Sequence, residues 1–324
     1  MSCLNKRHIL EIEDLSITFS QYEKGLNQVE LPVISNLSVS VHEGEIVAII
    51  GSSGSGKSLL AHAILNLLPY NASVSGKIYF DGEELTKERA EKLRGNEIAF
   101  VPQSTKYLDP LMQVGRQVRG GKKMSKKEQR EAQALQKQLF EEYGLEEMVE
   151  NLYPFECSGG MERRILFLSA LMGNPELIIA DEPTPGMQLE LAKKSMEAFR
   201  KFADKGKGVL LITHDIELAL EVADRIAIFY AGTTVEEALV TDFQSEELLR
   251  HPYTKALFRA LPQNGFQSLP GNQPYVKDMP KGCPFGPRCE WYSKECQGEI
   301  PMKVVRCGQV RCAKIEGESG GHHH

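Results

Sequence analysis

Eight consecutive residues form the clearest chemical motif of the sequence, because they match the pattern G-x-x-x-x-G-K-[ST] that holds nucleotide phosphates. In order they are Gly51, Ser52, Ser53, Gly54, Ser55, Gly56, Lys57 and Ser58. Glycines let consecutive backbone N–H groups curl around a β-phosphate, and the N-terminus of a following helix attracts the same charge. The Lys57 side chain can reach the β- and γ-phosphates, and the Ser58 hydroxyl can bind Mg²⁺. This phosphate loop predicts a site for a nucleoside triphosphate.

A pair of carboxylates follows the apolar run Leu-Ile-Ile-Ala at residues 177–180. The run is typical of a buried strand, and Asp181 and Glu182 come directly after it. Open α/β sheets place ligands at the carboxyl ends of their strands, so both side chains are expected near the phosphate loop. Asp181 suits a direct or water-mediated contact with Mg²⁺. Glu182 suits polarising the water that attacks the γ-phosphate.

A second glycine-rich segment precedes a helical pattern and reads Cys157, Ser158, Gly159, Gly160 and Met161. The serine can cap that helix while the glycines expose their N–H groups, which makes a second anion site in one chain. One nucleotide does not need both sites. The segment resembles the L-S-G-G-Q signature of the ATP-binding cassette ATPases. In that family two chains pack head to tail, and the resemblance implies that Ser158, Gly159, Gly160 and Met161 act on the nucleotide of a partner chain.

Three further residues are similar to site residues of this family. Gln103, after a predicted strand, resembles the Q-loop glutamine, which approaches Mg²⁺ and the attacking water. His214, at the end of another predicted strand, resembles the switch histidine that senses the γ-phosphate. Phe19 lies near the position of the aromatic residue that stacks on adenine, and a place in the core is the alternative. The resemblance implies ATP and Mg²⁺ as cofactors and Glu182, His214 and Gln103 as catalytic residues.

Two departures from the family pattern bear on activity. Cys157 and Met161 stand where Leu and Gln are usual, although Ser-Gly-Gly-Met occurs in the branch that imports peptides and nickel. Gln188 stands where the family's D-loop supplies an Asp. Its amide cannot provide that carboxylate. In a pair of such ATPases each ATP site is formed by both chains, so this change bears on whether both sites hydrolyse ATP. The intact catalytic residues favour an active enzyme.

Five of the seven cysteines fall near the C-terminus, at Cys283, Cys289, Cys296, Cys307 and Cys312. With the segment that begins at His251, this pattern resembles the C-terminal extension of oligopeptide, dipeptide and nickel importer ATPases. The spacing lacks the paired C-x2-C of a zinc ribbon. A four-iron four-sulfur cluster fits better, and Cys283, Cys289, Cys296 and Cys312 match the branch pattern best. Zinc and free thiols are the alternatives.

The elements around these motifs alternate. Short apolar runs near residues 45–50, 98–101, 177–180, 209–212 and 226–229 predict strands, and helical patterns lie between them. This order predicts an α/β fold with a mostly parallel sheet. The family resemblance implies that it is a P-loop NTPase of the ABC ATPase type with a helical signature subdomain and a Cys-rich C-terminal extension. We expect an ATPase domain at residues 8–250 with a helical insertion at about 104–175, an extension at 251–316 and a tag remnant at 317–324. Many prolines in the extension predict little regular structure.

Length and charge narrow the class further. The chain has 324 residues, and 38 Lys and Arg against 44 Asp and Glu give a net charge of −6, which argues against nucleic acid as a partner. No run of about 18 apolar residues occurs. The resemblance to the peptide and nickel importer branch implies an ATPase on the cytoplasmic face of the membrane that energises peptide or nickel import with a second, related ATPase, two permeases and an extracellular substrate-binding protein. The alternatives are a regulatory subunit that carries a cluster and a soluble ABC protein without a transport role.

Overall fold

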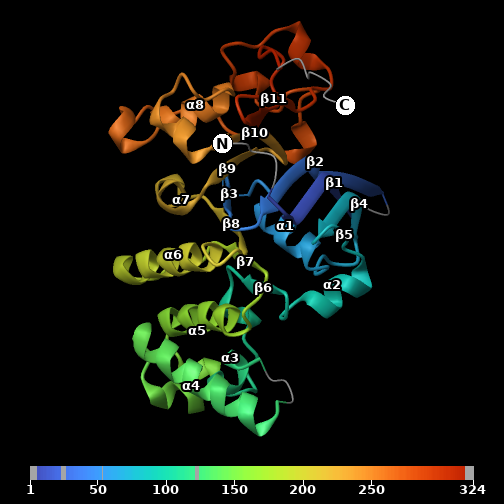
Figure 1. The fold of residues 1–324 in the computed structure, drawn as a ribbon. Coiled ribbons are helices and arrows are strands. Elements are labelled where there is room, and N and C mark those ends of the chain that lie inside the picture. The colour runs from blue at the N-terminus through green and yellow to red at the C-terminus, as the bar shows by residue number, and fades with distance from the viewer. Residues whose placement is uncertain (1–5, 23–26, 53, 121–123, 318–324) are drawn as a thin grey trace.

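The computed structural model describes residues 6–22, 27–52, 54–120 and 124–317, and contains two β-sheets with helices around the larger one (Figure 1). The larger sheet has the strand order β11-β12-β10-β9-β3-β8-β7-β6. Its strands are β3 (Ile46–Gly51), β6 (Ile98–Val101), β7 (Leu177–Asp181), β8 (Gly208–Thr213), β9 (Arg225–Tyr230), β10 (Thr233–Leu239), β11 (Lys303–Val305) and β12 (Gly308–Val310). The five strands from β9 to β6 run parallel, so the predicted α/β sheet is confirmed.

Strand β3, which leads to the phosphate loop, is buried on both faces. Ile46, Ala48 and Ile50 lie in one core, and Val47 and Ile49 lie in the other. Successive side chains of a strand point to opposite faces, so a continuous apolar run suits a sheet that is covered on both sides. Figure 1 shows this cover: α6 and α7 lie on one side of β3 and β8, and α1 lies on the other.

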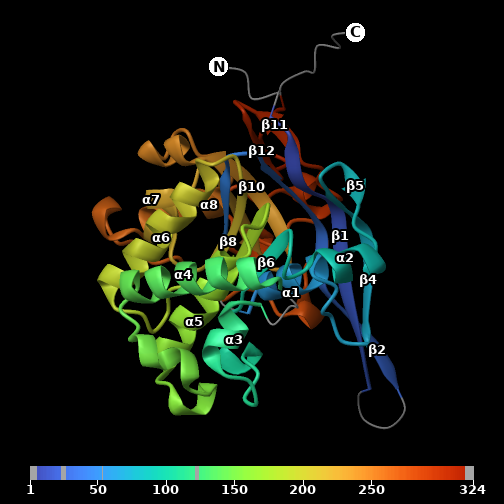
Figure 2. The same ribbon diagram turned by 60° about the horizontal axis from the view of Figure 1, so that its bottom comes forward.

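The second sheet is antiparallel, with the order β2-β1-β4-β5. Its strands are β1 (His8–Tyr22), β2 (Gln28–His42), β4 (Ala72–Phe80) and β5 (Glu83–Glu84). The pairing of β1 with β2 is irregular, because its register shifts between Ile12 and Leu15, and Asp14 has a φ of 47°. Figure 2 shows this sheet on the side of the molecule opposite α4, α5 and α6.

Eight helices occur in the described residues: α1 (Lys57–Ile64), α2 (Lys87–Leu93), α3 (Val114–Val118), α4 (Lys126–Glu142), α5 (Gly159–Met172), α6 (Leu189–Ala203), α7 (Ile216–Val222) and α8 (Pro252–Arg259). Helix α4 lies in the expected helical insertion and starts with a capping box. Ser125 Oγ accepts from the Glu128 N–H, and Glu128 Oε2 accepts from the Ser125 N–H at 2.7 Å. Lys122 and Lys123, which precede α4 in the sequence, lie outside the described residues.

The expectation of little regular structure beyond residue 249 is wrong in two places. Helix α8 begins with Pro252 in its first turn, after His251, whose Nδ1 accepts from the Tyr253 N–H at 3.1 Å. Farther on, β11 and β12 form a hairpin whose second strand pairs antiparallel with β10. The extension therefore covers the sheet edge that β10 would otherwise leave unpaired. No local sequence pattern predicts this pairing.

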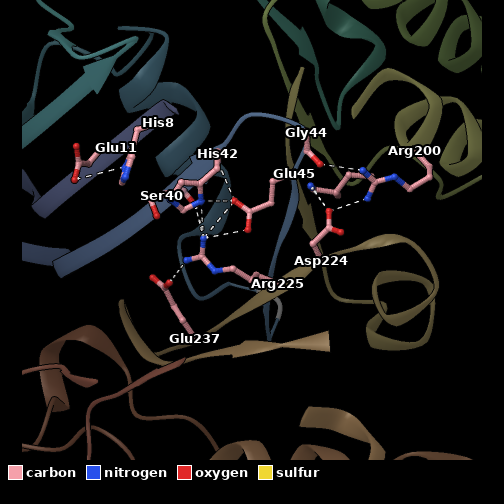
Figure 3. Close-up of polar contacts among 11 residues, drawn as sticks. His8, Glu11, Ser40, His42, Gly44, Glu45, Arg200, Asp224, Arg225 and Glu237 are labelled. Atoms are coloured by element: carbon pink, nitrogen blue, oxygen red, sulfur yellow. Dashed lines mark hydrogen bonds and ion pairs between the residues drawn. The ribbon is translucent and has the colours of Figure 1, made fainter. Parts of the chain in front are cut away.

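A buried ion network joins the strand of the phosphate loop to the edge that carries the extension (Figure 3). The Arg225 guanidinium of β9 donates to Glu45 Oε1 at 3.2 Å and to Glu237 of β10. Glu45 Oε2 also lies 2.7 Å from His42 Nδ1. Burial raises the pKa of Glu237, and Arg225 opposes that rise. Arg225 therefore compensates two carboxylates that are almost wholly removed from water.

Candidate functional site

The phosphate loop connects β3 to α1. Two of its positions favour glycine, one because of the space around it and one because of its backbone conformation. A Cβ on Gly51 would lie 2.4 Å from the Phe229 carbonyl oxygen. Gly56, the N-cap of α1, has a φ of 93°, where a side chain would be strained. Ser53 lies outside the described residues. The predicted order of strand, glycine turn and helix is confirmed, with the loop at the carboxyl end of β3.

The Lys57 side chain folds back over this loop. Its Nζ donates to the Gly51 carbonyl at 2.7 Å and to the Ser52 carbonyl at 2.8 Å. Burial lowers the pKa of Lys57, while the nearby carboxyl groups of Glu182 and Asp181 favour its charged form. The lysine is thus a buried cation at the loop where phosphate oxygens would bind.

Asp181 at the end of β7 has the properties of a metal ligand. Its side chain is buried, and its Oδ1 has no hydrogen-bond partner among the described residues. Burial raises its pKa, and a hydrogen bond from Ser58 opposes that rise. A buried carboxylate oxygen without a partner is costly unless a ligand meets it. Asp181 and Ser58 are therefore an oxygen donor set that fits Mg²⁺.

Glu182 and His214, from the ends of β7 and β8, contact each other. His214 Nδ1 lies 2.8 Å from Glu182 Oε1, and Thr213 Oγ1 donates to Glu182 Oε2 at 3.5 Å. Glu182 is buried and has a φ of 48°, a left-handed conformation that is strained for a side chain of this size. His214 is far more exposed. The sheet thus brings a fixed carboxylate and an accessible imidazole to the edge that holds Lys57.

Gln103 lies just beyond β6, and its side chain is exposed. The backbone carbonyl oxygen of Gln103 accepts a hydrogen bond from the Arg163 guanidinium of α5 at 3.2 Å. The same Arg163 lies beside Gly186, where a Cβ would be 3.3 Å from the arginine Nε. Sequence reasoning missed Arg163. It stands two residues after Met161, and a basic residue near a phosphate-binding motif is the signal that could have found it.

The segment that resembles the family signature forms the start of α5. Ser158 Oγ accepts from the Met161 N–H at 3.3 Å, so the predicted cap is confirmed. Ser158 and Gly159 are exposed, and Gly160 and Met161 are half-buried. The glycine N–H groups at this helix start are therefore placed where an anion from outside the chain can approach.

Phe19 and Gln188 make their contacts in other parts of the fold. Phe19 lies in β1, opposite Leu31 and Ala72, and packs partly buried against the core beneath the antiparallel sheet. Gln188 is exposed and is the N-cap residue of α6, without a side-chain cap bond.

A histidine that the sequence reasoning did not use lies near the acidic pair. His62 of α1 stands four residues after Ser58, so the two share a helix face. Its Nε2 lies 2.9 Å from the hydroxyl of Tyr107. Burial lowers the pKa of His62, and the charge of Asp181 opposes this. The spacing of four from Ser58 was the available signal.

The four cysteines proposed as ligands line one small pocket in the extension. Cys296 and Cys312 are buried, and Cys283 and Cys289 are half-buried. Burial raises the pKa of Cys283 to about 11 and also raises the pKa of Cys289 and of Cys312. The exposed Cys307 is not among the residues that line this pocket.

The surroundings of this pocket are aromatic and apolar. Buried His251 lines it, and burial lowers the pKa of this imidazole to about 3, so it is neutral. Within the described part of the chain, no three His, Cys, Asp or Glu side chains are arranged to hold a metal ion. The thiols are thus gathered at one place without the geometry of a single-ion site.

Comparison with known proteins identifies the class. Residues 34–185 match the family "ABC transporter", and residues 235–296 match the family "Oligopeptide/dipeptide transporter, C-terminal region". The dimeric structure of a post-hydrolysis state of the ATP-binding cassette MJ0796, bound to ADP and Pi, superposes with a TM-score of 0.61 at 29% identity, over 71% of this chain and 98% of that one. The fold and site define an ATPase of the ATP-binding cassette class, coupled to transport.

Full-length relatives narrow the family. The oligopeptide transport ATP-binding protein OppD of Escherichia coli (strain K12) is 31% identical over 94% of this chain and 92% of its own length. The oligopeptide transport ATP-binding protein AppD of Bacillus subtilis (strain 168) is 31% identical over 96% of this chain and 98% of its own. The chain belongs to the ABC transporter family, with the C-terminal region of its oligopeptide and dipeptide branch, as the sequence motifs predicted. Among the described residues, no helix has the length and apolar character to cross a membrane.

Proposed function

We propose that this chain is the ATP-hydrolysing subunit of a peptide importer and acts at the cytoplasmic face of the membrane. The observation that carries the proposal is the group formed by Lys57, Asp181, Glu182 and His214 at one edge of the sheet, in a chain that also has the peptide-transporter extension. Relatives named as an oligopeptide transport ATP-binding protein, as OppD is, or as a putative peptide import ATP-binding protein support the choice of peptide.

In the proposed reaction the phosphate loop binds ATP, and the Lys57 ammonium meets the β- and γ-phosphate oxygens. Ser58, Asp181 and Gln103 would hold Mg²⁺, which neutralises charge on those oxygens when it is bound. Phe19 would stack on the adenine. The remaining loop residues, Gly51, Ser52, Ser53, Gly54, Ser55 and Gly56, would provide the N–H groups around the β-phosphate.

Glu182 orients the attacking water and accepts its proton as the water oxygen bonds to the γ-phosphorus and the bond to ADP breaks. His214 keeps this carboxylate in place through the 2.8 Å contact and is accessible enough to meet the γ-phosphate. The buried, strained backbone of Glu182 supports this assignment, because strain of this kind is found at functional sites.

The exposed start of α5 supports a paired arrangement of ATPases. Ser158, Gly159, Gly160 and Met161 would close over the ATP of a second, related ATPase chain, whose own signature closes over the phosphate loop of this one. Arg163 joins α5 to the Gln103 backbone. A movement of α5 when the signature closes over the partner's ATP would therefore also displace the Q-loop. Gln188 supplies no carboxylate at the start of α6, which favours unequal rates at the two sites.

Two permeases are the proposed membrane partners, and an extracellular substrate-binding protein would complete the importer. Their docking surface on this chain would be the insertion at about residues 104–175, where Leu111 and Met148 are exposed large apolar side chains. Lys126 and Lys127 at the start of α4 are exposed in the same insertion. The insertion thus offers both apolar and basic side chains to a partner.

We also propose that the extension at residues 251–316 holds a four-iron four-sulfur cluster on Cys283, Cys289, Cys296 and Cys312. Their shared pocket supports this, and a cluster separates its ligands more widely than one zinc ion does. Anaerobic purification tests it: brown protein with iron and acid-labile sulfide is expected. Colourless anaerobic protein without both elements would exclude the cluster.

The experiment for the function is purification of the chain with its permeases and binding protein, followed by ATPase assays with candidate solutes. Peptides are expected to stimulate hydrolysis in the assembled transporter. Stimulation by nickel or a nickel chelate, and not by peptides, would contradict peptide as the substrate while leaving the ATPase assignment intact.

A further inference from the structure

The C-terminal extension reaches the phosphate loop itself. Ser52 Oγ donates to Gln273 Oε1 at 2.5 Å, which joins residues 221 positions apart. The Ser52 carbonyl also accepts from Lys57 Nζ and from Ser55 Oγ, both at 2.8 Å. Ser52 therefore contacts the extension, the Lys57 side chain and the turn of the phosphate loop.

Gln273 belongs to a segment, residues 269–283, that we name the strap. Its first end is anchored by Arg288, which donates to the Pro270 carbonyl at 2.9 Å and to the Leu269 carbonyl at 3.2 Å. The same guanidinium donates to the Tyr230 hydroxyl at 3.2 Å. Since Tyr230 ends β9, this anchor fastens the strap to the central sheet.

The other end of the strap enters the cysteine pocket. The Cys283 N–H donates to the Cys296 carbonyl at 2.9 Å. Gly282 has a φ of 85°, and a Cβ there would lie 2.1 Å from the same carbonyl oxygen. The backbone thus passes so close to Cys296 that this end is tightly constrained.

Between its anchors the strap lies along the antiparallel sheet. The short helix η6 (Val276–Asp278) contacts β2, and a cavity of about 420 Å³ separates Met279 and Gly282 from Pro32 and Val235. The strap is therefore held at both ends and at η6. In this span the Gln273 side chain forms a hydrogen bond with the described part of the phosphate loop, at Ser52.

We propose that Gln273 is a positioning residue of the ATP site: through Ser52 it keeps the first turn of the phosphate loop in the conformation that accepts phosphate. The extension would thereby set the ATP affinity of the domain that it follows in the chain. The proposal rests on ATP binding by the phosphate loop, which is part of the proposed function. A glutamine held by a strap can do this because its amide oxygen accepts without adding negative charge near phosphate.

A double-mutant cycle on the purified full-length chain tests this, with the dissociation constant for ATP measured by calorimetry. Gln273→Ala and Ser52→Ala are each expected to raise that constant about three- to tenfold, the value of one hydrogen bond. The double variant is expected to match the larger single effect, because both changes remove the same bond. In the assembled transporter, KM for ATP should rise while kcat stays within about twofold.

Gln267→Ala is the matched control, because Gln267 is an exposed glutamine of the extension whose backbone N–H donates to the Arg259 carbonyl at 2.9 Å. It should bind ATP like the wild type, and thermal melts of all variants should show that they are folded. An unchanged or lower dissociation constant in Gln273→Ala, or additive effects in the double variant, would overturn the proposal. Absence of ATP binding by the wild type would instead contradict the proposed function.

Discussion

Replacing Arg225 by Met should destabilise the fold strongly, because it leaves Glu45 and Glu237 without their shared cation. The side chains of these two glutamates are 8% and 6% exposed, so water cannot substitute for the guanidinium. Breaking a buried ion pair by removing one partner costs about 3–5 kcal/mol. We expect a loss of that size in the free energy of unfolding, measured with urea near neutral pH.

The matched control is Arg200→Met in the same region (Figure 3). Arg200 donates to Asp224 at 2.7 Å and to Asp204 at 2.8 Å, but both carboxylates are well exposed. Exposed pairs contribute at most about 1 kcal/mol, so this variant should lose little. Equal losses in the two variants would refute the reasoning, since burial would then not decide the cost.

The pH dependence supplies a second check on the Arg225 variant. Burial already raises the pKa of Glu237, and loss of Arg225 should raise it further above the unfolded value. The folded state then binds the proton more tightly, so stability is retained at low pH and falls as pH rises through the folded pKa. The deficit of Arg225→Met against the wild type should therefore shrink as the pH falls through the raised pKa of Glu237. Adding Glu237→Gln should recover part of the loss at high pH.

Three further changes test the site, the surface and the cysteine pocket. Asp181→Asn should weaken ATP binding in the presence of Mg²⁺ but not in EDTA, measured by calorimetry, and equal weakening in both would contradict the assignment of this carboxylate. Lys126→Glu with Lys127→Glu should reduce co-purification with the permeases and the coupled ATPase rate, and unchanged assembly would count against docking at the insertion. Cys289→Ser should lower the iron content of anaerobic protein whereas Cys307→Ser should not, and equal iron in both would argue against Cys289 as a ligand.

The parts of the site that the sequence predicted are those set by local structure. The phosphate loop needs glycines at fixed positions before a helix, and Asp181 and Glu182 follow an apolar strand directly, so both patterns are visible in short windows. The signature serine is visible for the same reason, because an N-cap is a contact within one turn. Each such motif carries its own geometry, and the parallel sheet brings the motifs together.

The parts that the sequence did not predict depend on contacts between distant segments. The bond between Ser52 and Gln273 crosses 221 positions, and nothing near Gln273 indicates a partner in the phosphate loop. The pairing of β12 with β10 was missed for a similar reason, since a three-residue strand has almost no pattern of its own. In the sequence Arg225 is one charged residue at the start of a predicted strand. Only the fold shows that it is buried between two carboxylates.

In the proposed mechanism Glu182 activates water for ATP hydrolysis at this chain's own phosphate loop. The direct measurement is single-turnover hydrolysis by the assembled transporter, with the partner ATPase disabled at its phosphate-loop lysine. Glu182→Gln should lower the rate by about 10²–10⁴-fold with ATP still bound, as loss of a general base does. The control Glu221→Gln, an exposed residue of α7, should leave the rate unchanged. Hydrolysis by Glu182→Gln at the wild-type rate would contradict the role of Glu182, and absence of hydrolysis by the wild type in this assay would instead favour a regulatory subunit.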